Sequence, residues 1–347
     1  MTGEAREQKA LALVSVLFWK ANLLMPELPE VETIARGLRE SVLGRRILSV
    51  RLGKTDFIDD PIALEQHLPG KQITAVERHG KFMLLRLAQP ATEGSGGSPP
   101  SGTTNGDGDS ASLLVHLGMT GHIAPHPGLQ PCKKHTHACF LLDDGRELRY
   151  TDARRFGRMA YLAGAALEEE LHGLGADPLE VSTEEFVVRV RMRQARVKAL
   201  LLDQGVLRGV GNIYADESLW RAKIHPARLG ARLTRKQAEA LHHALRAILE
   251  KAILMRGSSI SDFLDADGEP GEYQRRHRAY GREGKPCYRC RTLIWRTIVA
   301  GRSSYFCPRC QRALRGSAVT LPLPKRRIKR RKTADRSKRN KQRPLLS

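Results

Sequence analysis

The sequence of 347 residues has no long hydrophobic run and few cysteines. Its best apolar stretch, residues 11–18, has eight residues, whereas about 20 are needed to cross a bilayer, so a transmembrane helix is excluded. An export signal is disfavoured because Glu4 and Glu7 offset Arg6 and Lys9 near the start. Four of the six cysteines form two CxxC pairs, which in a reducing compartment indicate metal binding rather than disulfides.

Acidic residues are outnumbered by basic ones. Lys and Arg number 59 and Asp and Glu 37, which gives a formal net charge of +22. Residues 325–347 contain twelve Lys or Arg and one Asp, so half of the excess lies in this tail and half in the body. A hydrophobic content of 41% is enough for two or three folded units. The composition therefore predicts folded domains that bind a polyanion, with nucleic acid as the first candidate.

The hydrophobic spacing of the first half indicates one helix followed by strands. Pro29 fits a first helical turn, apolar residues follow it at helical spacing, and Gly44 ends the segment. We expect a sheet domain over residues 25–165, with a flexible Gly/Ser/Pro-rich insertion at residues 90–112. The predicted strands lie within the short apolar runs at residues 47–52, 82–87, 113–117, 138–142 and 148–150.

The spacing of the second half is helical from about residue 183. Thr234 and Gln237 form a capping-box pattern, and Gly257 ends the helix that follows. We expect a helical domain over residues 175–275, a cysteine-bounded unit over 280–311 and a disordered basic tail over 315–347.

The cysteine-bounded unit has the spacing of a zinc site. Cys287 and Cys290 form one CxxC pair, Cys307 and Cys310 form the other, and 16 residues with hairpin character separate the pairs. Four thiolates can hold one Zn²⁺ tetrahedrally. Because four protein ligands close the coordination shell, we expect this single zinc ion to be structural and to activate no water.

A second group of candidate ligands lies at Cys132, His135, His137 and Cys139. If the chain is extended from His135 onward, His135, His137 and Cys139 share one face of a strand and Cys132 lies off it. We expect no metal here and favour phosphate contact or a packed strand.

Several motifs then carry a resemblance to a known family. Residues 25–33 read MPELPEVET, and residues 113–121, 150–157 and 209–217 read LLVHLGMTG, YTDARRFG and GVGNIYADE. Together with residues 262–271 and the cysteine unit, they closely resemble the formamidopyrimidine-DNA glycosylases over residues 25–311. The resemblance implies an α+β multidomain protein: an N-terminal β-sandwich with flanking helices, a helix-two-turn-helix domain and a C-terminal zinc-finger β-hairpin.

The resemblance makes Pro26 the nucleophile, because the family places this proline at the mature amino terminus. A terminal secondary amine with a pKa of about 8 is neutral far more often at pH 7 than lysine at about 10.4. Within a chain the same nitrogen is an amide with a delocalised lone pair and is not nucleophilic. Here residues 1–24 precede Met25. We therefore expect the active protein to lack this extension, through a start at Met25 or through processing.

Further catalytic roles also follow from the resemblance. Glu27 would protonate the departing base or the ribose oxygen, and Glu30 could orient the amine. Lys81 matches the family lysine assigned to β-elimination. Arg302 matches the arginine that contacts the lesion phosphate and assists δ-elimination.

The resemblance also assigns the DNA contacts. A flipped nucleotide leaves a gap in the duplex, and Met119, Arg154 and Phe156 match the family's void-filling residues. By position, we expect Arg193, Lys198 and Asn212 to bind phosphates. His116 and His135 match family positions near DNA. Histidines within strands are, however, often core residues whose hydrogen bonds are made inside the protein.

The sequence thus predicts a monomeric, DNA-associated cytoplasmic enzyme of base excision repair. We expect a bifunctional glycosylase and AP lyase that releases oxidised purines, such as 8-oxoguanine and formamidopyrimidines, from duplex DNA and nicks by β,δ-elimination. One alternative is an endonuclease VIII-like enzyme for oxidised pyrimidines. Another is a noncatalytic damaged-DNA-binding protein, which is what the chain would be if Pro26 stayed unexposed.

Overall fold

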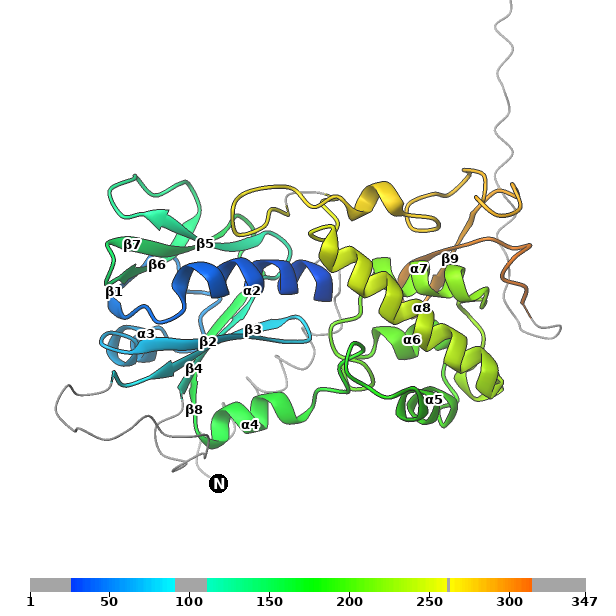
Figure 1. Ribbon diagram of the computed structural model, residues 1–347, viewed down its shortest axis with the longest axis horizontal. Helices are drawn as coiled ribbons and strands as arrows, with labels where there is room; N and C mark the ends of the chain where they lie inside the picture. The colour runs from blue at the N-terminus through cyan, green and yellow to red at the C-terminus, as the bar shows by residue number, and fades with distance from the viewer. Residues whose placement is uncertain (1–25, 91–110, 261–262, 314–347) are drawn as a thin grey trace, which may run out of the picture.

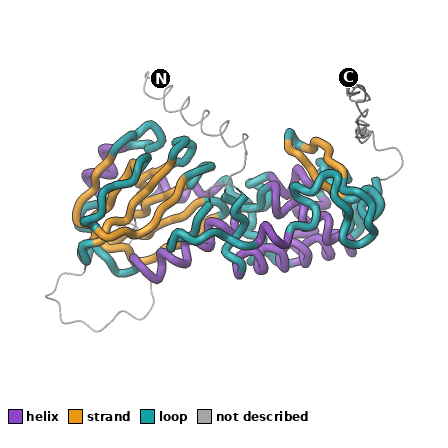
Figure 2. Tube along the Cα trace, turned by 90° about the horizontal axis from the view of Figure 1, so that it is seen from above, coloured by secondary structure: helices purple, strands orange, loops and turns teal. Residues whose placement is uncertain are grey.

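The computed structural model describes residues 26–90, 111–260 and 263–313. Two regions lie side by side along its long axis, one rich in strands and one rich in helices (Figure 1). Viewed from above, a small separate hairpin rises over the helical region (Figure 2). The predicted extension at 1–24 and the predicted basic tail fall outside the described residues, as does nearly all of the predicted insertion.

Two four-stranded antiparallel sheets form the strand half. One has the order β1-β6-β7-β5 and the other the order β2-β3-β4-β8. The strands of the first sheet are β1 (Ile47–Leu52), β5 (Gly121–Pro127), β6 (Thr136–Leu142) and β7 (Arg146–Asp152). Those of the second are β2 (Gln72–His79), β3 (Phe82–Ala88), β4 (Ala111–His116) and β8 (Arg158–Ala163).

The core of this half lies between the sheets and helix α2 (Leu28–Val42). Its apolar stripe of Ile34, Leu38 and Val42 is fully buried, which the helical spacing predicts. Alternate strand residues such as Leu113 and Val115 reach the same core from β4. The short helix α3 (Pro61–His67) adds Leu64 to that core and contacts β1 and β8.

The helical half has its own core, built mainly from α5, α7 and α8. As predicted, Thr234 caps α8 and exchanges a capping box with Gln237. The helices of this half are α5 (Thr183–Arg191), α6 (Val197–Leu202), α7 (Asn212–Ala222) and α8 (Arg235–Leu254), with two 3-10 turns, η1 (Gly230–Arg232) and η2 (Tyr273–Arg276). The short helix α4 (Ala165–His172) packs on β8 of the strand half.

Strands β9 (Trp295–Val299) and β10 (Arg302–Phe306) pair as the hairpin between the two CxxC motifs. The predicted α+β class, with a sheet domain, a helical domain and a zinc-finger hairpin, is therefore confirmed. Three strands, β2, β5 and β8, lie outside the predicted runs. The sequence QITAVERH of β2 alternates in polarity only over its first four residues, and two prolines interrupt the pattern of β5.

Candidate active site

Three chain segments converge where the two halves meet. The backbone N–H of Leu28, at the start of α2, donates to the carbonyl of Gly209 at 3.0 Å. Gly80, in the β2–β3 turn, lies against Arg208, where an added Cβ would come within 2.9 Å of the arginine Cβ. Gly80 and Gly209 have positive φ angles of 64° and 88°, which suit glycine. The start of α2, the β2–β3 turn and the loop before α7 thus form one site.

The Glu27 carboxylate caps the helix of the other half. Its Oε1 accepts the backbone N–H of Ile213 at 3.0 Å and its Oε2 accepts that of Tyr214 at 3.3 Å, both in the first turn of α7. The side chain is almost completely buried, and burial raises the pKa of Glu27 while Lys81 and the two amides oppose that shift. Gly211 leaves the room needed, since an added Cβ would overlap Glu27 Cδ. A secluded carboxyl of this kind can act as a general acid.

Glu30 holds Glu27 in place from one helical turn further along. Its Oε2 accepts the backbone N–H of Glu27 at 2.9 Å, and its Oε1 accepts the Tyr214 hydroxyl and the Ser258 backbone N–H at 2.5 and 2.6 Å. Burial, reinforced by the Glu27 charge, raises the pKa of Glu30 to about 7. Glu30 therefore links the start of α2 to both α7 and the segment after α8.

Lys81 follows the β2–β3 turn and is only 6% exposed. Burial lowers the pKa of Lys81, the Glu27 charge opposes this, and the Arg302 charge lowers it further. Its neighbour Phe82 pairs in register with His116 on β4. Burial and the nearby Lys81 charge lower the pKa of His116 to about 4, so this imidazole is neutral at pH 7 and its Nδ1 accepts the Gly118 backbone N–H. Glu27, Lys81, Arg302 and His116 thus share one electrostatic environment.

The predicted phosphate ligand Lys198 is fully buried. Its Nζ lies 2.7 Å from Asp216 Oδ1 on α7 and donates to the Ser303 carbonyl at 2.8 Å. Asp216 also accepts the Tyr305 backbone N–H at 2.9 Å. Burial lowers the pKa of Lys198 and Asp216 opposes that shift. In this structure Lys198 joins α6, α7 and β10, and so fixes the strand that begins with Arg302.

The three predicted void-filling residues lie on two adjacent loops. Met119 follows β4, while Arg154 and Phe156 follow β7. Asp152 joins the loops, because its carboxylate accepts the Thr120 hydroxyl and the backbone N–H of Arg154. Phe156 is 44% exposed, and the Arg154 guanidinium stacks 4.7 Å from its ring centroid.

The other predicted DNA contacts lie at separate positions. Arg193 is exposed and donates to the Arg189 carbonyl at 2.7 Å. Asn212 is the first residue of α7, and its Oδ1 is buried with no hydrogen-bond partner among the residues that the structure describes. His135 has a φ of 67° just before β6, so it does not share a strand face with His137 and Cys139.

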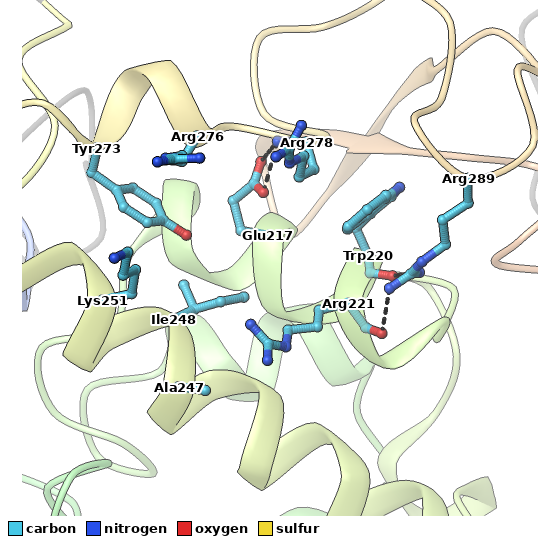
Figure 3. A pocket seen from close by; sticks show the side chains of 10 residues that line it. All are labelled: Glu217, Trp220, Arg221, Ala247, Ile248, Lys251, Tyr273, Arg276, Arg278 and Arg289. Atoms are coloured by element: carbon cyan, nitrogen blue, oxygen red, sulfur yellow. Dashed lines mark hydrogen bonds between the residues drawn. The ribbon is translucent and has the colours of Figure 1, made fainter.

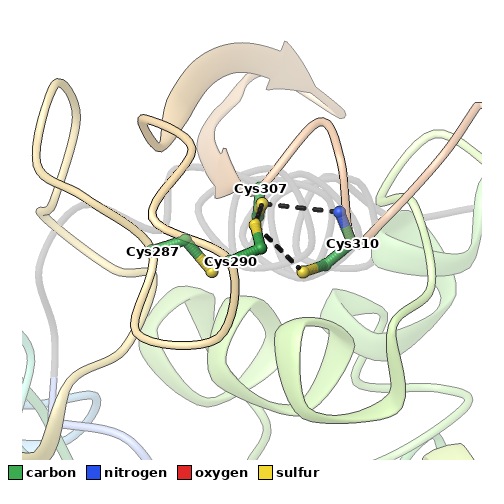
Figure 4. Close-up of side chains that lie close together, drawn as sticks. All are labelled: Cys287, Cys290, Cys307 and Cys310. Carbon is green, nitrogen blue, oxygen red and sulfur yellow. Dashed lines mark hydrogen bonds between the residues drawn. The ribbon is translucent and has the colours of Figure 1, made fainter.

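The four cysteines of the hairpin unit form one cluster (Figure 4). Their Sγ atoms all lie within 4.8 Å of one another. The Cys290 Sγ is 3.4 Å from that of Cys307 and 3.5 Å from that of Cys310, while Cys287 and Cys307 are buried. Four convergent sulfurs fit one tetrahedral Zn²⁺ and leave no position for a substrate. The predicted structural zinc site is thereby confirmed.

A basic pocket of about 420 Å³ lies between α7, α8 and the segment that follows α8 (Figure 3). Arg221, Arg276, Arg278 and Arg289 line it together with Lys251. Its one acid, Glu217, accepts the backbone N–H groups of Arg278, Ala279 and Tyr280. This carboxylate therefore orders the segment that leads to the zinc hairpin.

Sequence reasoning missed the residues that support the site. Tyr214, Asp216 and Ser258 hold Glu30 and Lys198 from the helical half. Tyr214 and Asp216 lie within the GVGNIYADE motif. Asp216 could have been identified from the sequence, because it is an acidic residue on the apolar face of a helix. Ser258 acts through its backbone N–H, which gives no side-chain signal.

Comparisons with known proteins agree with this geometry. Family models match the formamidopyrimidine-DNA glycosylase N-terminal domain at residues 25–159, its H2TH domain at 174–264, and the zinc finger found in FPG and IleRS at 284–313. The chain is 41% identical to the formamidopyrimidine-DNA glycosylase of Solibacter usitatus over 290 residues, which cover 83% of this chain and 100% of that protein. It is 42% identical to that of Chloroflexus aggregans, with 83% and 98% covered.

Solved structures give the same result. The MutM (Fpg) protein of Thermus thermophilus is 39% identical, with a TM-score of 0.68 over 82% of this chain and 98% of that one. The Lactococcus lactis Fpg mutant G226P, in complex with DNA containing Fapy-dG, is 31% identical, with a TM-score of 0.72 over 83% and 100%. A second Lactococcus lactis complex holds DNA with an abasic site and has a TM-score of 0.71 at 31% identity, over 83% of this chain and 100% of that one.

Proposed function

The chain belongs to the formamidopyrimidine-DNA glycosylase family, and from this premise we propose that it excises oxidised purines through a Schiff base on Pro26 and then nicks the strand. It is a DNA glycosylase of base excision repair that acts on damaged duplex DNA and carries one structural zinc ion. The observation that carries the proposal is the buried Glu27 carboxyl, which lies next to Pro26 in the chain and is bound to the amides of α7.

The reaction begins at the amine. The Pro26 nitrogen attacks C1′ of the damaged nucleoside as the glycosidic bond breaks and the base leaves. The C1′–O4′ bond then breaks and opens the sugar ring, and Glu27 delivers a proton to the departing base or to the ribose oxygen. The iminium that results withdraws electrons and acidifies the C2′ proton. Loss of this proton expels the 3′ phosphate, and a second elimination expels the 5′ phosphate. Burial raises the pKa of Glu27, which keeps the acid protonated to a higher pH than free glutamate.

Two cations surround this chemistry. Burial lowers the pKa of Lys81, so a larger fraction of its amine is neutral and able to accept the C2′ proton. Arg302, at the start of β10, binds the lesion phosphate and assists the second elimination. The Lys198–Asp216 ion pair sets the position of Arg302, since Lys198 also binds the carbonyl of the next residue.

Recognition of the flipped base requires the duplex gap to be filled. Met119, Arg154 and Phe156 are assigned to this gap, and the tie through Asp152 keeps their loops in fixed relation. Asn212 lies at the start of α7, where its side-chain NH2 group could donate to a phosphate, since the amides of the next two residues are bound by Glu27. Arg193, His116 and His135 complete the proposed DNA contacts.

The proposed place of action is DNA in the cytoplasm, with the protein as a monomer. Among the described residues no helix is both long and apolar enough to cross a membrane. The formal net charge of +22 favours binding to nucleic acid.

Borohydride trapping tests the proposed chemistry. Reduction of the iminium leaves a stable covalent protein–DNA adduct, so two forms are compared: the chain with all 347 residues and the chain that begins at Pro26. We expect an adduct on an 8-oxoguanine duplex only with the second form. A duplex with an oxidised pyrimidine in place of the purine tests the endonuclease VIII-like alternative.

Mass spectrometry of the cross-linked peptide then identifies the nitrogen. An adduct on the full chain, with every leading residue still attached, contradicts a Pro26 nucleophile. Damage-dependent binding by both forms without any adduct supports the noncatalytic alternative.

A further inference from the structure

Away from the Glu27 site, two cysteines meet on the sheet β1-β6-β7-β5. Cys139 lies on β6 and Cys132 on the connection between β5 and β6. Their Sγ atoms are 3.6 Å apart, and both are free thiols outside the four-cysteine cluster. A disulfide bond of about 2.05 Å requires the two sulfurs to approach each other by about 1.5 Å. The two sulfurs are therefore close enough to bond.

The two thiols differ in exposure. Cys132 is exposed, whereas Cys139 is 5% exposed. An external disulfide can reach Cys132, and Cys139 lies directly behind it as the second thiol. This pairing of an accessible thiol with a shielded resolving thiol is the arrangement of reversible thiol switches.

The segment that carries Cys132 is held against the sheet by a buried arginine. Arg149, on β7, is 3% exposed and donates to the carbonyls of Gln130 and Pro131, immediately before Cys132. The Arg149 Nε also donates to Glu147 at 2.7 Å. The approach of Cys132 to Cys139 is thus fixed by the fold and does not depend on a flexible encounter.

A second arginine lies directly at the sulfurs. The Arg51 guanidinium is 3.3 Å from the Cys132 Sγ and 3.3 Å from the Glu147 Oε1, and Arg51 is opposite Cys139 in the β1–β6 register. A positive charge at this distance attracts the negative charge on the sulfur that attacks in disulfide exchange. It also disfavours a metal ion, although Cys132, Cys139 and Glu147 place three donor atoms within 4.8 Å.

We propose that Cys132 and Cys139 form a reversible redox pair that exchanges with low-molecular-weight disulfides of the glutathione type. The Cys132 thiolate attacks one sulfur of the external disulfide, and the first small thiol leaves. The Cys139 thiol then loses its proton, attacks the Cys132 sulfur and expels the second small thiol. Two protein thiols and one disulfide thus give one protein disulfide and two small thiols. The new bond fixes the connection that carries Lys133, Lys134 and His135.

The test uses the zinc-loaded full chain with glutathione disulfide as the oxidant. Peptide mass spectrometry without reduction is expected to find a 132–139 linkage that is two hydrogen atoms lighter than the reduced peptide, and dithiothreitol is expected to reverse it. Thiol titration of the native protein is expected to fall by two, while zinc content stays at one ion per chain. A product that stops as glutathione on Cys132, or both thiols remaining free, overturns the proposal. Two zinc ions per chain that block oxidation also overturn it, in favour of a metal site.

Matched variants separate the parts of the argument. Cys139→Ser is expected to leave a stable mixed disulfide on Cys132, and Cys132→Ser is expected to leave Cys139 unreactive. Arg51→Gln is expected to slow the first exchange severalfold, because it removes a positive charge that lies 3.3 Å from the attacking sulfur. An unchanged rate in Arg51→Gln removes the arginine from the proposal. None of these readouts depends on glycosylase activity, so the outcome is independent of the proposed function.

Discussion

The strand half and the helical half contribute differently to the active site. The strand half supplies side chains from the ends of its elements: Glu27 before α2 and Lys81 after the β2–β3 turn. The helical half supplies mainly backbone: the amides of Ile213 and Tyr214 bind Glu27, and that of Ser258 binds Glu30. The proposed acid and the proposed base thus lie on the strand half, while the helical half fixes the position of the acid and, through the β10 hairpin packed on α7, carries Arg302.

This difference predicts how mutations on the two halves should differ in their effect on activity. Removal of a reacting side chain deletes a step, whereas a backbone donor can be disturbed only through its surroundings. Loss of a reacting side chain should therefore cost more activity than displacement of a backbone donor.

Glu27→Gln is expected to have the largest effect. The amide cannot protonate the leaving group, so base excision should fall by about 10²–10⁴-fold in single-turnover assays on an 8-oxoguanine duplex. A duplex with a preformed abasic site needs no base departure, and borohydride trapping on it should be much less affected. Equal losses on both substrates would contradict protonation of the departing base by Glu27 and would leave a role at the ribose oxygen or in structure.

Loss of zinc should come second. Cys290→Ser removes one of four ligands, and the β9–β10 hairpin that carries Arg302 should lose its order. We expect about a 10²-fold fall in duplex incision, because a catalytic group is misplaced. Metal analysis and circular dichroism check the cause. If zinc is lost and incision is unchanged, the hairpin has no role in the reaction.

Gly211→Ala tests the backbone contribution. The new Cβ would overlap Glu27 Cδ, so the carboxylate must leave the α7 amides, and excision should fall by about 10–100-fold. Gly173→Ala is the matched control, because its φ is −77° and nothing lies within 4 Å of the added carbon. A loss of activity in the control equal to that in Gly211→Ala would refute the steric explanation.

The two halves each bury a carboxyl whose ionisation should affect stability. Burial raises the pKa of Glu30 and of Glu217 to about 7 each, from a usual value near 4.5. The folded chain therefore binds these protons more tightly than the unfolded chain, and the free energy of unfolding should fall as pH rises from about 4.5 to 7. Urea unfolding at several pH values measures the slope. Glu217→Gln should flatten it, and an unchanged slope would mean that Glu217 titrates normally.

The basic tail should have the smallest effect on chemistry. Truncation after Ser317 removes the whole of residues 325–347, whose net charge is +11, so binding to undamaged duplex should weaken and its salt dependence should decrease. If the remaining interface neutralises about six phosphates, its log–log salt slope should be near −5. Single-turnover excision should stay nearly constant, and its loss would place the tail in the reaction.

Much of the fold was predictable, because hydrophobic residues that recur at helical or strand spacing identify the buried faces. The stripe of Ile34, Leu38 and Val42 predicted α2, and the spacing of the cysteine pairs predicted the zinc cluster. The contact between Cys132 and Cys139 was not predictable, since it depends on Arg149 holding a connection by backbone carbonyls. The burial of Lys198 was equally hidden, because a lysine on a short helix looks like a surface charge until Asp216 is brought to it.

Strands β3 and β4 pair directly, yet 22 residues separate Ala88 from Ala111. The junction joins the end of β3 to the start of β4. Lys81 and His116 lie at the opposite end of this strand pair, about 20 Å away along the strands. Since the entropy of closing such a connection grows only slowly with its length, its size can change without disturbing the paired strands. The junction is consequently a suitable place to graft a fluorophore or an affinity tag, from which repair could be followed while the proposed nucleophile at Pro26 is left without an added sequence.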